Sequence, residues 1–183
     1  MTDLDDVAPH LPASRRPLLG DDWLARRDEW DAGLPPLTAG RQPAAVSPPE
    51  GGAAVRAGVL LMSGADDASH RTSQSDEGEP DCDYWHGLMH RREPDYGNAL
   101  YWFRRVGQHP AMDGLPEDAA MIAAALGAEA EASGVLGPPW DGAAMVRLCE
   151  RAERSPASEL HLFARAVQWA EMRRLMRHCL RGG

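Results

Sequence analysis

The strongest constraint on the fold is a helical repeat of apolar residues near the end of the chain. Between residues 156 and 180, apolar residues recur at spacings of three and four, at Leu162, Ala166, Trp169, Met172, Met176 and Cys179. This spacing places them on one face of an α-helix. No segment of the chain alternates apolar and polar residues as a half-buried strand does. The sequence therefore predicts an all-α fold with a long helix facing the core.

Five further helices are expected from residue 54 onward. Four are predicted at residues 54–64, 96–106, 116–133 and 140–154, and the fifth is predicted to end at Pro94. Asp81 or Asp83 is expected to cap the helix before Pro94. Pro94 should end that helix, because the residue before a proline avoids the helical region. Asp95 should cap the following helix, and Gly107 should supply its left-handed exit. We therefore expect one irregular bundle of about six helices.

Residues 1–53 are rich in proline and less regular than the remainder. One short helix is predicted at 21–32, with Trp23 and Trp30 on one face and Gly33 at its end. The other residues of this segment are expected to form an extended arm wrapped on the domain, or to be partly disordered. The domain organisation is then an arm, 1–53, and a helical domain, 54–183.

Composition excludes several classes of function. The chain has 183 residues and a formal net charge of −9, which argues against nucleic acid or an anionic membrane as its partner. Arginine supplies every cation, because the sequence contains no lysine, and lysine-based chemistry is therefore excluded. Three widely spaced cysteines, an acidic N-terminus unlike a signal peptide and no apolar run of roughly 18 residues favour a cytoplasmic protein with reduced thiols.

The chemistry is concentrated in residues 84–110, YWHGLMHRREPDYGNALYWFRRVGQHP. This block contains all three tyrosines, three of the seven histidines and two Arg-Arg pairs. Elsewhere the chain is rich in Ala, Gly, Pro and Asp. Such a concentration of polar and aromatic side chains is typical of a binding or catalytic site.

A metal site is one interpretation of this block. His86, His90 and Glu93 follow one another at i, i+4 and i+7, which places them on one helix face. Two histidines one turn apart can share a divalent metal ion, completed by a carboxylate or by a third histidine. His70 and His109 are the candidates for that third nitrogen. The zinc-protease pattern H-E-x-x-H is absent, because Gly87 follows His86.

A second interpretation is acid–base chemistry without a metal. His86 or His90 would be the general acid or base, and Glu93 or Asp95 would orient it. Arginines would hold an anionic or polyhydroxyl substrate between aromatic walls. The predicted substrate-binding residues are Arg91, Arg92, Asp95, Asn98, Tyr101, Arg104, Arg105 and, from the last helix, Glu171.

A third interpretation is structural. Buried Trp and Tyr side chains need hydrogen-bond partners, and the His, Arg and Glu side chains of the block can supply them. Cys149 and Cys179 lie on apolar helix faces and are interpreted as core residues. Cys82 lies between Asp81 and Asp83, which raise rather than lower a thiol pKa.

The block resembles the signature of an uncharacterised bacterial and fungal protein family. Just upstream, Asp66-Asp67, Ser69-His70 and Ser73-Gln74 are similar to a second motif of that family, and weaker similarity extends the resemblance over residues 58–180. The resemblance implies that His70 belongs with His86, His90 and Glu93. It implies no activity, because none is established for the family.

We therefore expect an enzyme that acts on a small polar or anionic molecule by His/carboxylate chemistry, with His70, His86, His90 and Glu93 as the catalytic residues. One alternative is a divalent-metal-dependent enzyme with His70, His86 and His90 as ligands. Another is a non-catalytic ligand-binding or scaffold protein. The sequence does not determine the oligomeric state.

Overall fold

The computed structural model describes residues 3–39, 47, 49–135 and 137–182. Within these ranges every regular element is helical, which confirms the all-α prediction. The N-terminal elements are η1 (Leu4–Asp6), η2 (Ala8–His10), η3 (Ala13–Leu19), η4 (Trp23–Ala25), η5 (Arg27–Glu29) and α1 (Trp30–Gly33). The later elements are α2 (Ala53–Ser63), α3 (Asp66–Gln74), α4 (Pro80–Arg92), α5 (Tyr96–Val106), η6 (Pro110–Met112), α6 (Leu115–Leu126), α7 (Glu129–Ala132), η7 (Ser133–Val135), α8 (Gly142–Ala152) and α9 (Glu159–Leu180).

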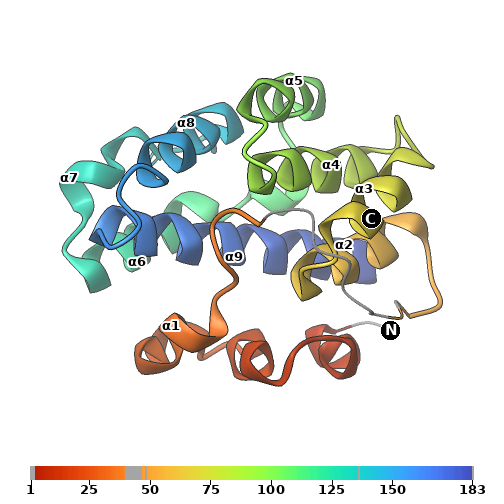
Figure 1. Cartoon of the computed structure of the whole chain (residues 1–183), viewed down its shortest axis with the longest axis horizontal. Coiled ribbons are helices and arrows are strands. Elements are labelled where there is room, and N and C mark those ends of the chain that lie inside the picture. Colours follow the sequence, from red (N-terminus) through yellow and green to blue (C-terminus); the bar gives the residue numbers. More distant parts are fainter. Residues whose placement is uncertain (1–2, 40–46, 48, 136, 183) are drawn as a thin grey trace.

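Helix α9 is the central element. It runs through the middle of the molecule, with the N-terminal turns along one side and α4, α5 and α8 on the other (Figure 1). Its predicted apolar stripe is buried at four of the six positions, while Leu162 and Cys179 are partly buried at the two ends. Ser158 caps the helix through its side chain, which accepts a hydrogen bond from the His161 backbone.

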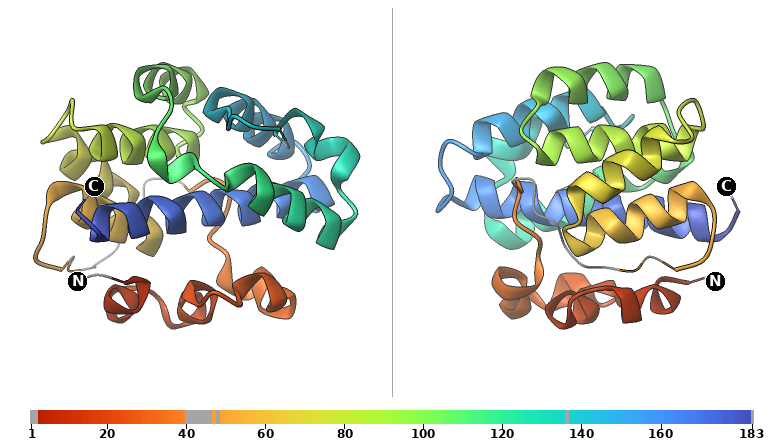
Figure 2. Two further views of the ribbon diagram at one scale, coloured as in Figure 1. Left: turned by 180° about the vertical axis from the view of Figure 1, so that it is seen from behind. Right: turned by 45° about the vertical axis from the view of Figure 1, so that its right-hand side comes forward.

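Residues 4–33 are not extended, contrary to the prediction of an extended arm. They form a chain of short helical turns that lies along α9 (Figure 2). The predicted helix at 21–32 is broken into η4, η5 and α1, although Trp23 and Trp30 do stack on one another at 5.5 Å. Backbone carbonyls left free by these short turns accept hydrogen bonds from α9: Trp169 donates to Leu18, and Arg165 donates to Leu34. The part of the predicted arm at 40–46 and 48 lies outside the described residues.

The central block forms two helices, as predicted, and Pro94 follows the first of them. Asp95 caps α5, because its side chain accepts a hydrogen bond from the Asn98 backbone N–H. Gly107, which follows the last residue of α5, has a φ of 63°. The cap of α4 was predicted wrongly. It is Glu79, whose carboxylate accepts hydrogen bonds from two backbone N–H groups in the first turn.

The number of helices also differs from the prediction of about six, since the described residues contain nine α-helices. Residues 66–74 form α3, which was not predicted because the segment has almost no apolar residues. The predicted helix 116–133 is divided at Gly127, which has a φ of 67° and ends α6. No helix among the described residues is both long enough and apolar enough to cross a membrane.

Candidate metal centre

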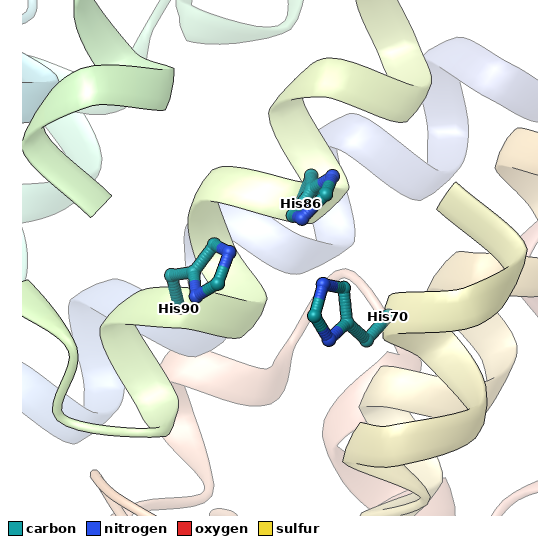
Figure 3. A group of neighbouring side chains, drawn as sticks. All are labelled: His70, His86 and His90. Atoms are coloured by element: carbon teal, nitrogen blue, oxygen red, sulfur yellow. The ribbon is translucent and has the colours of Figure 1, made fainter. Parts of the chain in front are cut away.

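Three histidines from two helices gather in one place. His86 and His90 lie one turn apart on α4, and His70 faces them from α3 (Figure 3). The ring centroids are 4.7 Å apart for His70 and His86, 5.1 Å for His70 and His90, and 4.9 Å for His86 and His90. One ring nitrogen of each residue lies within 4.8 Å of a nitrogen of the other two.

Polar contacts fix α3 so that His70 faces α4. At the start of α3, the Asp66 carboxylate receives two hydrogen bonds from Arg92 of α4, at 2.7 and 3.4 Å. One residue before His70, the Ser69 hydroxyl donates to the Ala57 carbonyl of α2 at 2.8 Å. Both side chains are fully buried. The position of His70 is therefore set by the two helices on either side of α3.

His86 is held between aromatic neighbours. Its ring stacks on Trp102 of α5, with centroids 4.0 Å apart and an interplanar angle of 18°. The adjacent Gly87 makes this close approach possible, because a Cβ at that position would lie 3.3 Å from the Trp102 Cβ and 3.4 Å from the Phe103 ring. The Nδ1 atom of His86 is buried and finds no hydrogen-bond partner among the described residues. That unpartnered nitrogen suits coordination to a metal ion.

His90 is backed by a carboxylate from its own helix end. Its Nδ1 lies 3.4 Å from Glu93 Oε2, an ion-pair contact that does not have the geometry of a hydrogen bond. A carboxylate accepts hydrogen bonds only, so this contact favours the tautomer with the proton on Nδ1 and a free lone pair on Nε2. Carboxylate–histidine pairs of this kind commonly orient metal-binding histidines.

The surroundings keep two of the three imidazoles neutral. Burial, followed by the neighbouring His90 and His70, lowers the pKa of His86 to about 3. Burial and then His70 also lower the pKa of His90, although Glu93 acts in the opposite direction. Neutral imidazole is the form that binds metal ions, because protonation occupies the lone pair.

The distances suit a small divalent ion. If three nitrogens lie within 4.8 Å of each other, a point exists no more than about 2.8 Å from all of them, whereas zinc–nitrogen bonds are about 2.0–2.1 Å. Side-chain movements of less than about 1 Å would close that difference. Three histidines leave one position of a tetrahedral ion open, which is the pattern of catalytic rather than structural zinc.

A second cluster, formed by Asp81, His109 and His178, is similar in its spacing. It differs in which ring nitrogen of a histidine carries the proton. His109 Nε2 lies 3.0 Å from Asp81 Oδ1, and His178 Nε2 lies 3.5 Å from the same oxygen. His109 Nδ1 accepts a hydrogen bond from the Ala111 backbone N–H at 3.2 Å, so the proton of the neutral ring lies on Nε2, the nitrogen near Asp81. That nitrogen therefore lacks the free lone pair that a metal ligand needs.

The second cluster corrects one interpretation from the sequence. His109, a candidate third ligand, belongs to this cluster and not to the group with His86 and His90. The other histidine of the cluster, His178, is half-buried and packs against His109 with centroids 4.9 Å apart. No helical spacing relates these residues, since they come from α4, the start of η6 and α9, so no local pattern could have revealed them.

Arg91 and Glu171 meet in the interior, away from solvent. Arg91 Nη2 donates to Glu171 Oε2 at 2.5 Å, Arg91 Nε donates to Gln168 at 3.1 Å, and the Tyr84 hydroxyl donates to Glu171 at 2.8 Å. All four side chains are fully buried. Burial and the Glu171 charge raise the pKa of Tyr84 well above its ordinary value, which keeps its hydroxyl protonated.

These contacts change the interpretation of three predicted substrate-binding residues. Glu171 does reach the central block from the last helix, as expected, but it contacts Arg91 and Tyr84 rather than the histidines. Arg92 is equally buried and is paired with Asp66. Their side chains hold helices together, and nothing in their geometry supports contact with a dissolved substrate.

The other predicted substrate-binding residues lie around α5. Asp95 and Asn98 form the helix cap and hydrogen bond to each other at 2.7 Å. Arg105 lies over Trp102 and pairs with Asp83 and Glu77, both at 2.8 Å. Tyr101 and Arg104 are exposed on the same helix. Arg105 lies near the histidines through the Trp102 ring that it shares with His86, and the Asp95 backbone N–H donates to the His90 carbonyl at 3.0 Å. Substrate binding by this group stays a prediction.

The cysteines are unreactive. All three are free thiols, as predicted, and none belongs to a group that could hold a metal ion among the described residues. Burial raises the pKa of Cys149 to about 12, and burial also raises the pKa of Cys82 and Cys179. Thiolate chemistry is therefore disfavoured in this fold.

Comparisons with family models, curated proteins and solved structures find no match to this chain. The resemblance to an uncharacterised family accordingly stays a prediction. The functional argument rests on the residues themselves, and foremost on the cluster of His70, His86 and His90.

Proposed function

We propose that the chain is a divalent-metal-dependent enzyme whose ion is held by His70, His86 and His90. The observation that carries this proposal is the convergence of three imidazole nitrogens within 4.8 Å from two helices. The lowered pKa values of His86 and His90, the unpartnered His86 Nδ1 and the Glu93 carboxylate behind His90 support it. Zinc is the ion that best suits three nitrogen ligands and an open fourth position.

The proposed chemistry is the activation of water toward a small polar molecule. An ion held by three neutral histidines lowers the pKa of bound water from 15.7 to about 7. His70 is only half-buried, so solvent reaches the cluster from the α3 side. Hydrolysis or hydration is therefore the favoured reaction class, with Glu93 as a positioning residue for His90.

The metal-free acid–base enzyme is the second candidate. The pairing of His90 with Glu93 at 3.4 Å favours it, since a carboxylate that orients a histidine is also the arrangement of a general base. Two of the four arginines that were expected to hold the substrate do not support this candidate, because Arg91 and Arg92 are buried in ion pairs. The unpartnered nitrogen of His86 also has no role in it.

Metal content separates the two candidates. The test is elemental analysis and zinc titration calorimetry of the full chain, alongside His86→Asn and His90→Asn variants. We expect one zinc ion per chain, lost in both variants. His161→Asn is the matched control, because His161 lies on α9, is half-buried, has its ring Nδ1 3.4 Å from the Ala152 carbonyl oxygen, and belongs to neither histidine cluster.

A second control addresses the other histidine cluster. His178→Asn should leave zinc stoichiometry unchanged, because the second cluster is not expected to bind the ion. Full zinc binding by the His86→Asn, His90→Asn double variant would refute the proposed site. Absence of zinc binding in the unmodified chain would leave the acid–base candidate.

A further inference from the structure

An arginine-rich cleft runs beside the C-terminal half of α9, on the side of the N-terminal turns. Its volume is about 460 Å³, within the range of small-molecule sites. Arg173, Arg174 and Arg177 of α9 line it, together with Arg181 directly after the helix. Figure 2 (left) shows this end of α9 between the N-terminal turns and the segment that leads into α6. None of the three histidines of the candidate metal centre lines the cleft.

The concentration of positive charge in this cleft is unusual for the chain. Four of its 19 cations line one cleft, where they outnumber three carboxylates, Asp21, Asp113 and Asp118, although the formal net charge of the whole chain is −9. Arg174 is paired with Asp118 at 2.6 Å, and Arg177 is paired with the exposed Asp21. The carbonyl end of a helix attracts cations, which accounts for Arg177 in the last turn but not for Arg173 further back.

Arg173 is a buried cation whose ion pair with Asp21 is long, at 4.0 Å, and whose guanidinium lies 5.2 Å from the centroid of the Trp23 ring. Its side chain is 6% exposed, and its Nη2 donates to the carbonyls of Leu19 and Gly20 at 2.7 and 2.8 Å. Its Nε is buried and has no hydrogen-bond partner among the described residues. Burial and the nearby Arg177 lower the pKa of Arg173 to about 10. Carbonyl partners do not neutralise a charge, so this guanidinium favours an anion nearby.

Asp21 shows where such an anion fits. Its carboxylate receives a hydrogen bond from Arg177 and lies 4.0 Å from Arg173 Nη2. The Asp21 side chain is itself 87% exposed, so little packing holds it there. A carboxylate carried on an exposed turn therefore occupies the position between two arginines that a ligand's carboxylate or phosphate could take.

We propose that this cleft binds a small organic molecule through a phosphate or carboxylate group, which is held by Arg173, Arg177 and Arg181 in competition with Asp21. Arginine forks suit both kinds of anion, because they donate two parallel hydrogen bonds to paired oxygens. The exposed Met121 and the half-buried Leu24 line the same cleft and offer apolar contacts to the remainder of the molecule. The site is independent of the metal centre.

Titration calorimetry of the full chain with inorganic phosphate, and separately with citrate, tests the proposal. We expect saturable binding of at least one of them. Arg177→Gln should weaken that binding by about 10-fold or more, because it removes a charge-assisted contact. Arg181→Gln, at an exposed position that cannot compromise folding, should weaken it by at least about 3-fold. Arg56→Gln is the matched control, since Arg56 is an exposed arginine on α2, and binding should stay within about 2-fold of the unmodified chain.

Asp21→Asn provides the opposite test. Removing the competing carboxylate should tighten anion binding by about 3-fold or more, although the overall charge changes by only one unit. Binding of phosphate rather than citrate would assign the site to phosphate-bearing molecules, and the reverse would assign it to carboxylates. The proposal is overturned if neither anion binds at millimolar concentration, or if Arg181→Gln and Arg56→Gln weaken binding equally.

Discussion

At the scale of single residues, the position of a proton distinguishes the two histidine clusters. His90 has a carboxylate against Nδ1, which leaves Nε2 free to bind an ion. His109 has a backbone N–H against Nδ1, which places its proton on Nε2. Both clusters bring their donor atoms within 4.8 Å. Proximity alone therefore does not identify a metal site, and the group that lies against Nδ1 of each ring distinguishes the two clusters.

Glu93 is the residue whose substitution tests this argument most directly. Glu93→Gln should lower zinc affinity by about 10-fold while the stoichiometry stays at one ion per chain, because outer carboxylates orient and strengthen a histidine ligand. Competition with a chromophoric chelator measures the affinity. The control is Glu150→Gln at an exposed position of α8. An unchanged affinity in Glu93→Gln would show that Glu93 does not support His90.

At the scale of helices, α3 is fixed by polar rather than apolar contacts. The segment contains only one alanine among polar residues, and it is held through Asp66, Ser69 and their partners on α4 and α2. Most helices of globular proteins are fixed by an apolar stripe. The placement of His70 therefore depends on a buried ion pair.

Replacing one partner of the Arg92–Asp66 ion pair should cost more stability than replacing both partners. Arg92→Met or Asp66→Leu alone leaves one buried charge unpaired and should lower the free energy of unfolding by about 3–5 kcal/mol. The double variant should recover much of this loss. Urea unfolding of all four proteins measures the coupling, with the exposed pair Arg154–Glu150 as the control, worth less than about 1 kcal/mol. Additive losses in the double variant would contradict the pairing.

The same helices show what could be predicted from the sequence. The boundary between α4 and α5 and the end of α5 were predicted correctly, because Pro94 and Asp95 at the boundary and Gly107 after α5 act on their immediate neighbours. Helix α3 was missed because its stabilising partners, Arg92 and Ala57, are distant in sequence. The cap of α4 was misassigned because several acidic residues precede the helix and only the backbone geometry selects Glu79.

The residues of the candidate site could likewise be predicted only in part from the sequence. His86 and His90 could be paired from their spacing on one helix, and the family resemblance implied His70. The buried state of Arg91 and Arg92 could not be predicted, because a pair of adjacent arginines reads as a solvated edge. The partner of Arg92, Asp66, belongs to α3, which precedes α4 in the sequence, and the partner of Arg91, Glu171, belongs to α9, which follows it.

At the scale of the whole molecule, a group of buried neutral histidines couples stability to pH. In the metal-free chain, His86 stays neutral in the folded state down to a pKa of about 3, whereas a histidine in the unfolded chain is protonated below about pH 6.5. His90 is shifted in the same direction. Between these limits the unfolded state binds more protons than the folded state, and stability therefore falls as the pH falls.

The metal-free chain should accordingly lose stability between pH 6.5 and pH 5, by up to about 1.4 kcal/mol per pH unit for each such histidine. Above pH 6.5 these histidines are neutral in both states and contribute no further dependence. The measurement is the free energy of urea unfolding in the presence of a chelator. His86→Phe should retain the stacking on Trp102 and reduce the slope, because phenylalanine does not titrate. His161→Phe is the comparison, and an equal reduction of the slope in both variants would show that the burial of His86 is not the cause.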